Sequence, residues 1–273
     1  MTSTVCSLRR LFISFIALLP IMFSSFSHAA SPVLDRVLDR GVVKVAMTGD
    51  QPPFNMISRS GRFIGYDVDL AQSLANAMNV ELEIVKVPFP ELISAIEAGR
   101  ADMIISGMSI TSLRSKSVSF VEPYMMAGKS LVSTEERMMQ LEQDGGFNRL
   151  GIKVAALSNS TSKTMVQLNM PKAEVVGISN YEEGLKLIRE RKVDALFADM
   201  AMCKLAVLRN PSDNFVTLKK PLSMEPVAVA VPHGDLHFFN LVRNFMVSYD
   251  RVGLPDRLHA KWFENGEWLA QLP

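Results

Sequence analysis

The sequence of 273 residues has few cysteines and almost no charge imbalance. Two cysteines, Cys6 and Cys203, are too few for a disulfide scaffold or for a zinc site built from cysteines. The 29 basic residues stand against 28 acidic ones, so no positive excess is available to neutralise phosphates and nucleic acid is not an expected partner. A hydrophobic fraction of 48% and a charged fraction of 21% are typical of a globular chain and exclude disorder.

Motifs of several catalytic classes are also missing. The chain carries no P-loop, no nucleophile elbow and no metal-binding helix motif. His233 and His237 have a spacing that would allow two metal ligands on one helix, but Gly234 between them argues against a helix there. We therefore expect no metal site and no cofactor.

The N-terminal region has the order of a secretory signal. Arg9-Arg10 precedes the apolar run 11–23, and small residues follow up to Ala29-Ala30. This order predicts a signal peptide over residues 1–30. The apolar run is shorter than the roughly 20 residues of a membrane span, and Pro20 interrupts it. Because no cysteine ends the run, a lipid anchor is not supported, and we expect the mature chain to be free in an exported compartment.

Cleavage at this point would leave 243 residues with 27 basic and 28 acidic side chains. Cys6 would be removed and Cys203 would have no partner within the chain, so the core and not a disulfide must hold the fold. A chain of this length suits one large domain or two lobes. No other apolar stretch approaches the length of a membrane span.

Short apolar runs alternate with helical patterns from Val42 to about Val216. Residues 42–47 are typical of a strand, and residues 67–78 carry apolar side chains at helical spacing. Ser133-Thr-Glu-Glu136 has the spacing of a capping box ahead of a polar helix, and Asp235 is a predicted cap of the final helical portion. The alternation predicts an α/β fold with a mainly parallel sheet.

Ligands of open α/β sheets bind beyond the carboxyl ends of the strands. Functional side chains are therefore expected directly after the predicted strands. The segments in these places are Thr48–Phe54, Phe89, Gly107–Arg114, Ser158–Thr161 and Asp199.

Several motifs carry a resemblance to a known family. They are Gly49–Phe54, Gly65–Leu70, Gly99–Arg114, Val118–Tyr124, Val193–Asp199 and Lys261–Phe263, and they occur in order over nearly all of the mature chain. With them the chain resembles the family 3 extracellular solute-binding proteins, the periplasmic receptors of amino-acid ABC importers.

The resemblance implies a two-lobed periplasmic-binding-protein fold of type II, with the ligand cleft between the lobes. Residues 31–128 and 223–273 are expected to form the first lobe, and residues 129–222 the second. It further implies a periplasmic monomer that captures an amino acid or a similar small zwitterion by lobe closure. The receptor would deliver this ligand to an inner-membrane ABC permease and would have no catalytic activity.

A free amino acid presents a carboxylate and an ammonium group, so its receptor needs an anion site and a cation site. The guanidinium of Arg114 can hold a carboxylate by two parallel charge-assisted hydrogen bonds, and the resemblance implies this role. Backbone amides near Gly107 and Ser109 and the Ser109 hydroxyl could add donors, and the missing side chain of Gly107 would let a ligand approach closely. The alternative for Arg114 is a solvated arginine at a helix N-terminus.

Three further residues have both a functional and a structural interpretation. The resemblance implies that Asp199 accepts the ligand ammonium, but an aspartate between a strand and a helix can also be an N-cap. Thr161 is expected to donate to the ligand carboxylate or to cap its helix, and Asn159 stands before it where relatives often have glycine. Phe89 is expected to pack on the ligand side chain or to belong to the core.

The departures from the family pattern bear on the ligand. Where many relatives have an acidic residue and a nearby aromatic after the first strand, this chain has Thr48 and Gln51. Neither residue offers charge to a basic side chain, so we predict a neutral or modestly polar amino acid.

Two other functions remain open at this point. Leu34–Gly41 and the Thr48-Gly-Asp50 turn are shared with secreted cyclohexadienyl dehydratases, enzymes of the same fold that aromatise prephenate or arogenate. Elimination of water needs a placed general acid, and at the position of the enzymes' glutamate this chain has Lys163. A ligand-sensing domain is the third alternative, but the sequence has no kinase or cyclase region and would need a separate partner.

Overall fold

The computed structural model describes residues 31–273, and the predicted signal peptide over residues 1–30 lies outside the described residues. Within the described part of the chain, no helix combines the length and the apolar character needed to cross a membrane.

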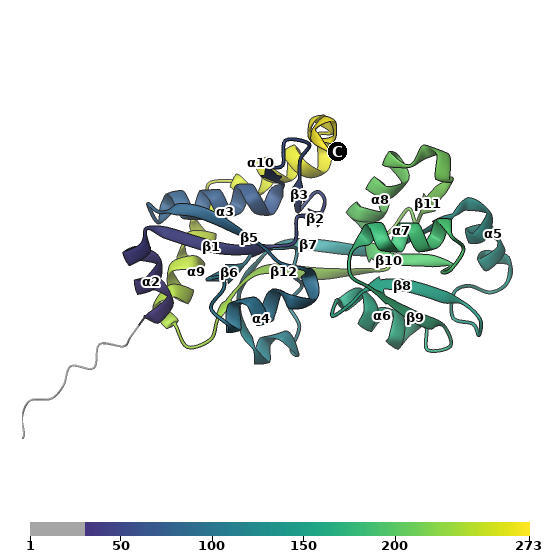
Figure 1. Cartoon of the computed structure of the whole chain (residues 1–273), viewed down its shortest axis with the longest axis horizontal. Helices are drawn as coiled ribbons and strands as arrows, with labels where there is room; N and C mark the ends of the chain where they lie inside the picture. The colour runs from purple at the N-terminus through teal and green to yellow at the C-terminus, as the bar shows by residue number, and fades with distance from the viewer. Residues whose placement is uncertain (1–30) are drawn as a thin grey trace, which may run out of the picture. The chain divides into compact units, whose positions relative to one another are not determined.

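Nine strands form one continuous sheet in the order β5-β1-β6-β12-β7-β10-β8-β9, with β11 paired to β7 (Figure 1). The strands are β1 (Val42–Met47), β5 (Glu81–Lys86), β6 (Met103–Ile104), β7 (Val118–Thr134), β8 (Lys153–Leu157), β9 (Glu174–Ile178), β10 (Ala195–Asp199), β11 (Phe215–Thr217) and β12 (Ser223–Pro232). A small antiparallel sheet contains β2 (Asp50–Gln51), β3 (Asn55–Ile57) and β4 (Phe63–Ile64).

Helices follow most strands, as an α/β fold requires. They are α2 (Pro32–Arg40), α3 (Tyr66–Ala77), α4 (Leu92–Glu97), α5 (Glu135–Gln143), α6 (Thr161–Asn169), α7 (Tyr181–Arg189), α8 (Met200–Arg209), α9 (Leu236–Arg251) and α10 (Leu254–His259). Shorter helical turns are η1 (Phe89–Glu91), η2 (Arg114–Lys116), η3 (Pro211–Asp213), η4 (Ala260–Glu264) and η5 (Glu267–Gln271).

Two parallel groups of strands define two lobes. In the first lobe β1 pairs in parallel with β5 and β6, and in the second β8 pairs in parallel with β9 and β10. The long strands β7 and β12 are antiparallel to each other and cross from one lobe to the other (Figure 1). Their ladder ends at the Lys129–Ser223 pair. The predicted lobe boundaries, after residues 128 and 222, stay predictions.

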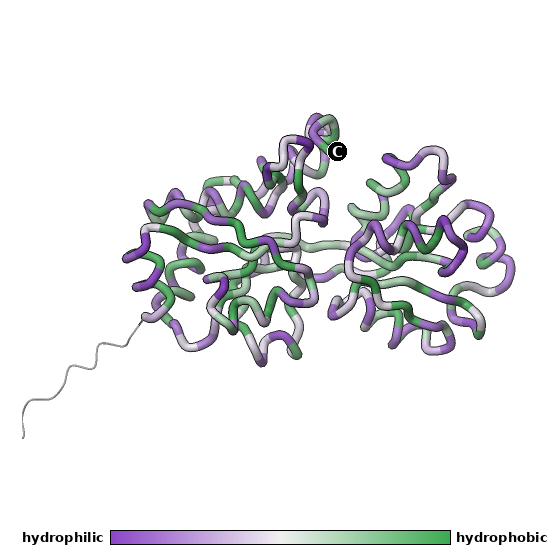
Figure 2. The backbone as a smooth tube through the Cα atoms, viewed as in Figure 1, coloured by the Kyte–Doolittle hydropathy of each residue, from purple (hydrophilic) through white to green (hydrophobic). Residues whose placement is uncertain are grey.

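Three clusters of buried apolar side chains support this arrangement. One lies mainly in the first lobe, takes in the C-terminal aromatics and includes Leu205 of the second lobe. A smaller one lies in the second lobe around Leu141 and Phe197. The third joins Phe89 and Met108 of the first lobe to Leu157 and Tyr181 of the second. Apolar residues are concentrated on the strands of both lobes (Figure 2). The lobes therefore contact each other in this structure through a shared apolar layer.

Of two helix N-caps predicted from the sequence, one is confirmed and one lies one residue away from its predicted position. Asp235 caps α9 by accepting from the Phe238 amide, as predicted. The predicted capping box, with Ser133 as the cap, is wrong by one residue. Thr134 accepts from the Arg137 amide, while the Ser133 hydroxyl donates to the Asp194 carbonyl. The pairing of β7 with its neighbours holds Ser133 inside the strand, so the helix begins one residue later.

Candidate functional site

Arg114 lies in η2, beyond the end of β6, and its side chain reaches both lobes. Its Nη1 donates to the Ser109 carbonyl at 2.8 Å, and its Nη2 donates to the Asn159 carbonyl of the second lobe at 3.0 Å. The guanidinium also lies 5.4 Å from the centre of the Phe89 ring. Arg114 is 8% exposed. The alternative of a solvated arginine therefore does not describe this residue.

Burial lowers the pKa of Arg114 to about 10, although the negative charges of Glu225 and Asp199 act in the opposite direction. At neutral pH the guanidinium still carries its charge. A guanidinium has five N–H donors, and the two carbonyl bonds leave further donors for an anion.

Ser109 and Thr161 come from opposite lobes and contact the same carboxylate. The hydroxyl of each donates to Oε2 of Glu225 at 2.6 Å. Glu225 belongs to β12, one of the two crossing strands. Glu225 is not among the site residues predicted from the sequence. Three segments far apart in the sequence thus place two hydroxyls around one carboxylate at the lobe interface.

Asp199 is paired with a buried lysine on the neighbouring crossing strand. Lys129 Nζ lies 2.8 Å from Asp199 Oδ1 and 3.6 Å from Glu225 Oε2. The Tyr181 hydroxyl donates to Asp199 Oδ2 at 3.4 Å. Asp199 occupies the N-cap position of α8, but among residues 31–273 its carboxylate accepts no capping bond from that helix. Its charge is directed to Lys129 instead.

The turn before α6 contains a residue in the left-handed backbone region. Asn159 has φ of 56°, in the left-handed region that asparagine tolerates better than most residues. Its side-chain amide donates to the Pro90 carbonyl of the first lobe at 3.3 Å. Ser160, and not Thr161, caps α6 by accepting from the Lys163 amide. The Thr161 side chain is therefore directed to Glu225 and not to its own helix.

Thr48, Gln51 and Gly107 are the remaining predicted site residues of the first lobe. The Thr48 hydroxyl donates to Asn55 Oδ1 at 3.0 Å, which ties it to the first lobe. Gly107 has φ of 57°, and a Cβ there would lie 3.4 Å from Gln51 Oε1. Within the described chain, that buried Gln51 oxygen has no hydrogen-bond partner. Gly107 and Gln51 are thus neighbours, whereas the Thr48 hydroxyl donates within the first lobe, to Asn55.

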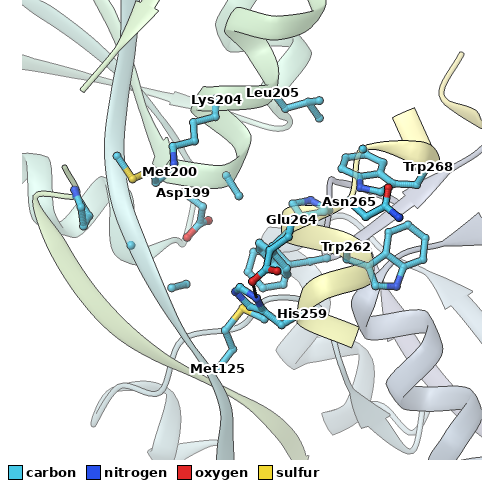
Figure 3. A pocket seen from close by; sticks show the side chains of 18 of the residues that line it. Met125, Asp199, Met200, Lys204, Leu205, His259, Trp262, Glu264, Asn265 and Trp268 are labelled. Carbon is cyan, nitrogen blue, oxygen red and sulfur yellow. Dashed lines mark hydrogen bonds and ion pairs between the residues drawn. The ribbon is translucent and has the colours of Figure 1, made fainter. Parts of the chain in front are cut away.

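A cavity of about 600 Å³ has Asp199 in its wall (Figure 3). Met200 and Leu205 of α8 line it from the second lobe, and Phe54 and Trp262 line it from the first. Met125 of β7 lies between these walls. The cavity is therefore mainly apolar and spans both lobes. Of the predicted site residues only Asp199 lines it, whereas Arg114 and Thr161 lie outside its wall.

Lys129 and Glu225 are the functional candidates that the sequence analysis missed. Lys129 interrupts the apolar run 125–132, and Glu225 directly precedes the apolar run 226–231. A charged residue inside a run that reads as buried strand needs a partner, and this signal could have drawn attention to both. Among residues 31–273, no group of three or more His, Cys, Asp or Glu side chains is placed to hold a metal ion.

The sequence pattern of the bacterial extracellular solute-binding proteins of family 3 matches residues 43–265. The chain belongs to this family. The family resemblance and the two-lobed type II fold expected from the sequence are thereby confirmed.

Individual relatives include both an enzyme and binding proteins. A cyclohexadienyl dehydratase of Pseudomonas aeruginosa is 28% identical over 252 residues, which cover 91% of this chain and 92% of that protein. An ABC transporter arginine-binding protein of Escherichia coli is 25% identical over 227 residues, 81% of this chain and 90% of that protein. The crystal structure of an ancestral amino-acid-binding protein, a precursor of cyclohexadienyl dehydratase, has 29% identity and a TM-score of 0.75, covering 84% of this chain and 99% of that one.

The prediction of a receptor without catalytic activity is contradicted by the first of these relatives. A dehydratase covers 91% of the chain within the same family. Membership of a solute-binding family is therefore no argument against an enzyme here. The argument against an enzyme was that Lys163 stands where the dehydratases have a glutamate. That argument concerned one position only, and a different carboxyl group, that of Glu225, lies between Ser109 and Thr161.

Proposed function

We propose that this chain captures an amino acid or a similar small zwitterion between its two lobes and delivers it to an inner-membrane ABC permease. The observation that supports this most is the position of Arg114, which contacts carbonyl groups of both lobes and shares the interface with Asp199. A ligand carboxylate would bind Arg114, Ser109 and Thr161, and the ligand ammonium would bind Asp199.

The remaining residues shape the site around these charges. Phe89 would pack on the ligand and on Arg114, while Gln51, Gly107 and Thr48 would form the first-lobe wall. The ligand remains proposed as a neutral or modestly polar amino acid, because Thr48 and Gln51 bring no charge. Residues 1–30 are proposed to direct export to the periplasm.

A ligand held in this way would contact both lobes and would stabilise their closed arrangement. A ligand shifts a conformational equilibrium only by its differential affinity for the two states. The proposed contacts supply that difference, since Ser109 belongs to the first lobe and Thr161 and Asp199 belong to the second. Only the closed form would bring the rims of both lobes into the arrangement that a permease can recognise.

Calorimetry with each of the twenty L-amino acids tests this function. We expect one or a few neutral or modestly polar amino acids to bind, and native mass spectrometry of protein purified without refolding should detect the retained ligand. Preference for arginine or lysine would contradict the predicted ligand class. Binding of none of the twenty would contradict the proposed function.

We also propose a second candidate function, dehydration of a cyclohexadienyl carboxylate at the same site. The dehydratase relative favours it, together with the Glu225 carboxyl group at the lobe interface. In this reaction the ring carboxylate would leave as CO₂, its bonding electrons would complete the aromatic ring, and the ring hydroxyl would depart as water after receiving a proton. Glu225 would first take up a proton on Oε1, since Ser109 and Thr161 donate to Oε2, and would then be the proton donor.

Incubation of the purified protein with prephenate tests the enzyme. Formation of phenylpyruvate, followed by its absorbance, would establish it, and Glu225→Gln should then remove the activity. Glu122→Gln is the matched control, because Glu122 is an exposed acid on β7. No phenylpyruvate above the level of the protein-free solution would exclude the dehydratase.

A further inference from the structure

The proposed carboxylate position already has a carboxylate in it, and the protein supplies it. A hydroxyl group has a single donor hydrogen, and the hydroxyls of Ser109 and Thr161 both direct it to Glu225 Oε2 at 2.6 Å. Neither hydroxyl can donate to a ligand until its bond to Glu225 breaks. Because Ser109 and Thr161 belong to different lobes, the same two bonds join the lobes through Glu225.

The proposed ammonium position has an ammonium group in it as well. Lys129 Nζ lies 2.8 Å from Asp199 Oδ1, and the Lys129 side chain is only 4% exposed. Lys129 and Asp199 are register partners on β7 and β10, so this pair belongs to the backbone pairing of the second lobe. Lys129 Nζ is also 3.6 Å from Glu225 Oε2. The two side chains therefore set a cation beside an anion, as an amino acid does.

The charges of the four groups balance. Arg114 and Lys129 are positive, and Asp199 and Glu225 are negative. Breaking a buried ion pair by removing one partner is strongly destabilising, because it leaves a charge unpaired away from water. A zwitterion that displaced Lys129 from Asp199 and Glu225 from the hydroxyls would bring one charge of each sign. The displaced pair could then remain paired to each other across β7 and β12.

We propose that Lys129 and Glu225 form an internal zwitterion that competes with the solute for both charged positions and joins the lobes through Glu225 before the solute binds. This inference rests on the proposed solute-binding function. It makes both side chains determinants of affinity: Glu225 competes with any carboxylate, and Lys129 competes only with ligands that bring an ammonium group.

Glu225→Gln is the main test, with Glu122→Gln as the matched control, because Glu122 is an exposed acid on β7. Small-angle X-ray scattering of the ligand-free proteins should give a larger radius of gyration for Glu225→Gln than for the wild type and the control. Calorimetry with the twenty L-amino acids should give a Kd roughly tenfold lower for Glu225→Gln, the order expected when a charge-assisted competitor is weakened. Glu225→Asp, with its shorter side chain, should change both measurements in the same direction.

Lys129→Met separates the two halves of the internal zwitterion. It should strengthen binding of an L-amino acid but not of the matched acid that lacks the α-ammonium, such as 3-phenylpropanoate beside L-phenylalanine. Glu225→Gln should strengthen binding of both. Circular dichroism will show whether Lys129→Met folds, and the Glu225→Gln comparison decides the proposal without it.

Unchanged scattering of Glu225→Gln, or a Kd equal to or above that of the wild type, overturns the proposal. If no amino acid binds to either protein, the solute-binding function and the competition both fail, and the ligand-free scattering decides only the joining of the lobes by Glu225. An increase in radius for Glu225→Gln would then support it, and no increase would overturn it.

Discussion

Two polar networks lie close to the strand ends of the first lobe, and they differ in the parts of the protein that they join. In the first, Asp67 accepts from Tyr124 at 2.7 Å and from Asn55 at 2.9 Å, and Asn55 accepts from Thr48. All four residues belong to the expected first lobe. In the second, Glu225 is contacted by hydroxyls of both lobes. Hydrogen bonds within one lobe can persist when the lobes separate, whereas the two bonds to Glu225 cannot both persist, because their donors belong to different lobes.

Arg114→Ala should have the largest effect on the second network. Loss of the guanidinium removes the proposed anion site, so we expect amino-acid affinity to fall by at least roughly a hundredfold, in line with loss of a charged, hydrogen-bonded partner. The thermal unfolding midpoint of the ligand-free protein should also fall, because the Ser109 and Asn159 carbonyls lose their guanidinium donors. Calorimetry and thermal unfolding measure the two effects.

Lys116→Ala serves as the control for this variant, because Lys116 is exposed and lies in the same turn as Arg114. Arg114→Lys keeps a positive charge but cannot offer two parallel donors, so it should recover only part of the affinity. Full affinity in Arg114→Ala would show that the carboxylate binds elsewhere.

Asp67→Asn, in the first network, should change how the free energy of unfolding depends on pH. Burial raises the pKa of Asp67 from 3.8 to about 6, against the lowering effect of the bonds from Tyr124 and Asn55. Between these pH values the folded protein binds more protons than the unfolded chain, so its free energy of unfolding falls as pH rises from about 4 to about 6 and levels off above. This rise in the pKa of Asp67 corresponds to roughly 3 kcal/mol at most.

Urea unfolding at several pH values measures this dependence. The free energy of unfolding of the wild type should fall between pH 4 and pH 6 relative to that of Asp67→Asn, because Asp67→Asn removes the titrating group. Parallel curves for the two proteins would contradict the raised pKa. Amino-acid affinity should not show this pH dependence in either protein, because Asp67 lies outside the second network.

Thr161→Val and Thr48→Val form a smaller but closely matched comparison. Each removes one hydroxyl and keeps the shape of the side chain. Thr161→Val should change amino-acid affinity by about tenfold or less. Thr48→Val should lower the free energy of unfolding by about 1 kcal/mol, because Asn55 Oδ1 loses one donor and keeps the Gly49 amide. Calorimetry and urea unfolding of both variants are needed. Because Thr48 is also proposed as part of the first-lobe wall, Thr48→Val should change amino-acid affinity, but by less than Thr161→Val. Equal changes would remove the distinction between the two networks.

The sequence was sufficient for the fold and for the residues at strand ends. Arg114, Ser109, Thr161 and Asp199 follow strands or stand in family motifs, so local pattern and resemblance both point to them. Their individual roles stay predictions.

Lys129 and Glu225 were missed because they lie on the crossing strands. Their significance depends on the pairing of β7 with β10 and β12, which joins segments distant in the sequence. A local sequence pattern does not indicate which distant strand will pair with β7 or β12, and so it does not place Lys129 and Glu225 beside their partners. The capping box failed for a related reason, since pairing of β7 and the bond from Ser133 to Asp194 keep Ser133 within the strand.

A crystal structure of the protein with the L-amino acid that binds most tightly in calorimetry would test the central claim most directly. We predict that the ligand carboxylate contacts Arg114, Ser109 and Thr161 in place of Glu225, and that its ammonium contacts Asp199 in place of Lys129. A ligand bound elsewhere, with the bonds of Ser109 and Thr161 to Glu225 unchanged, would contradict the account.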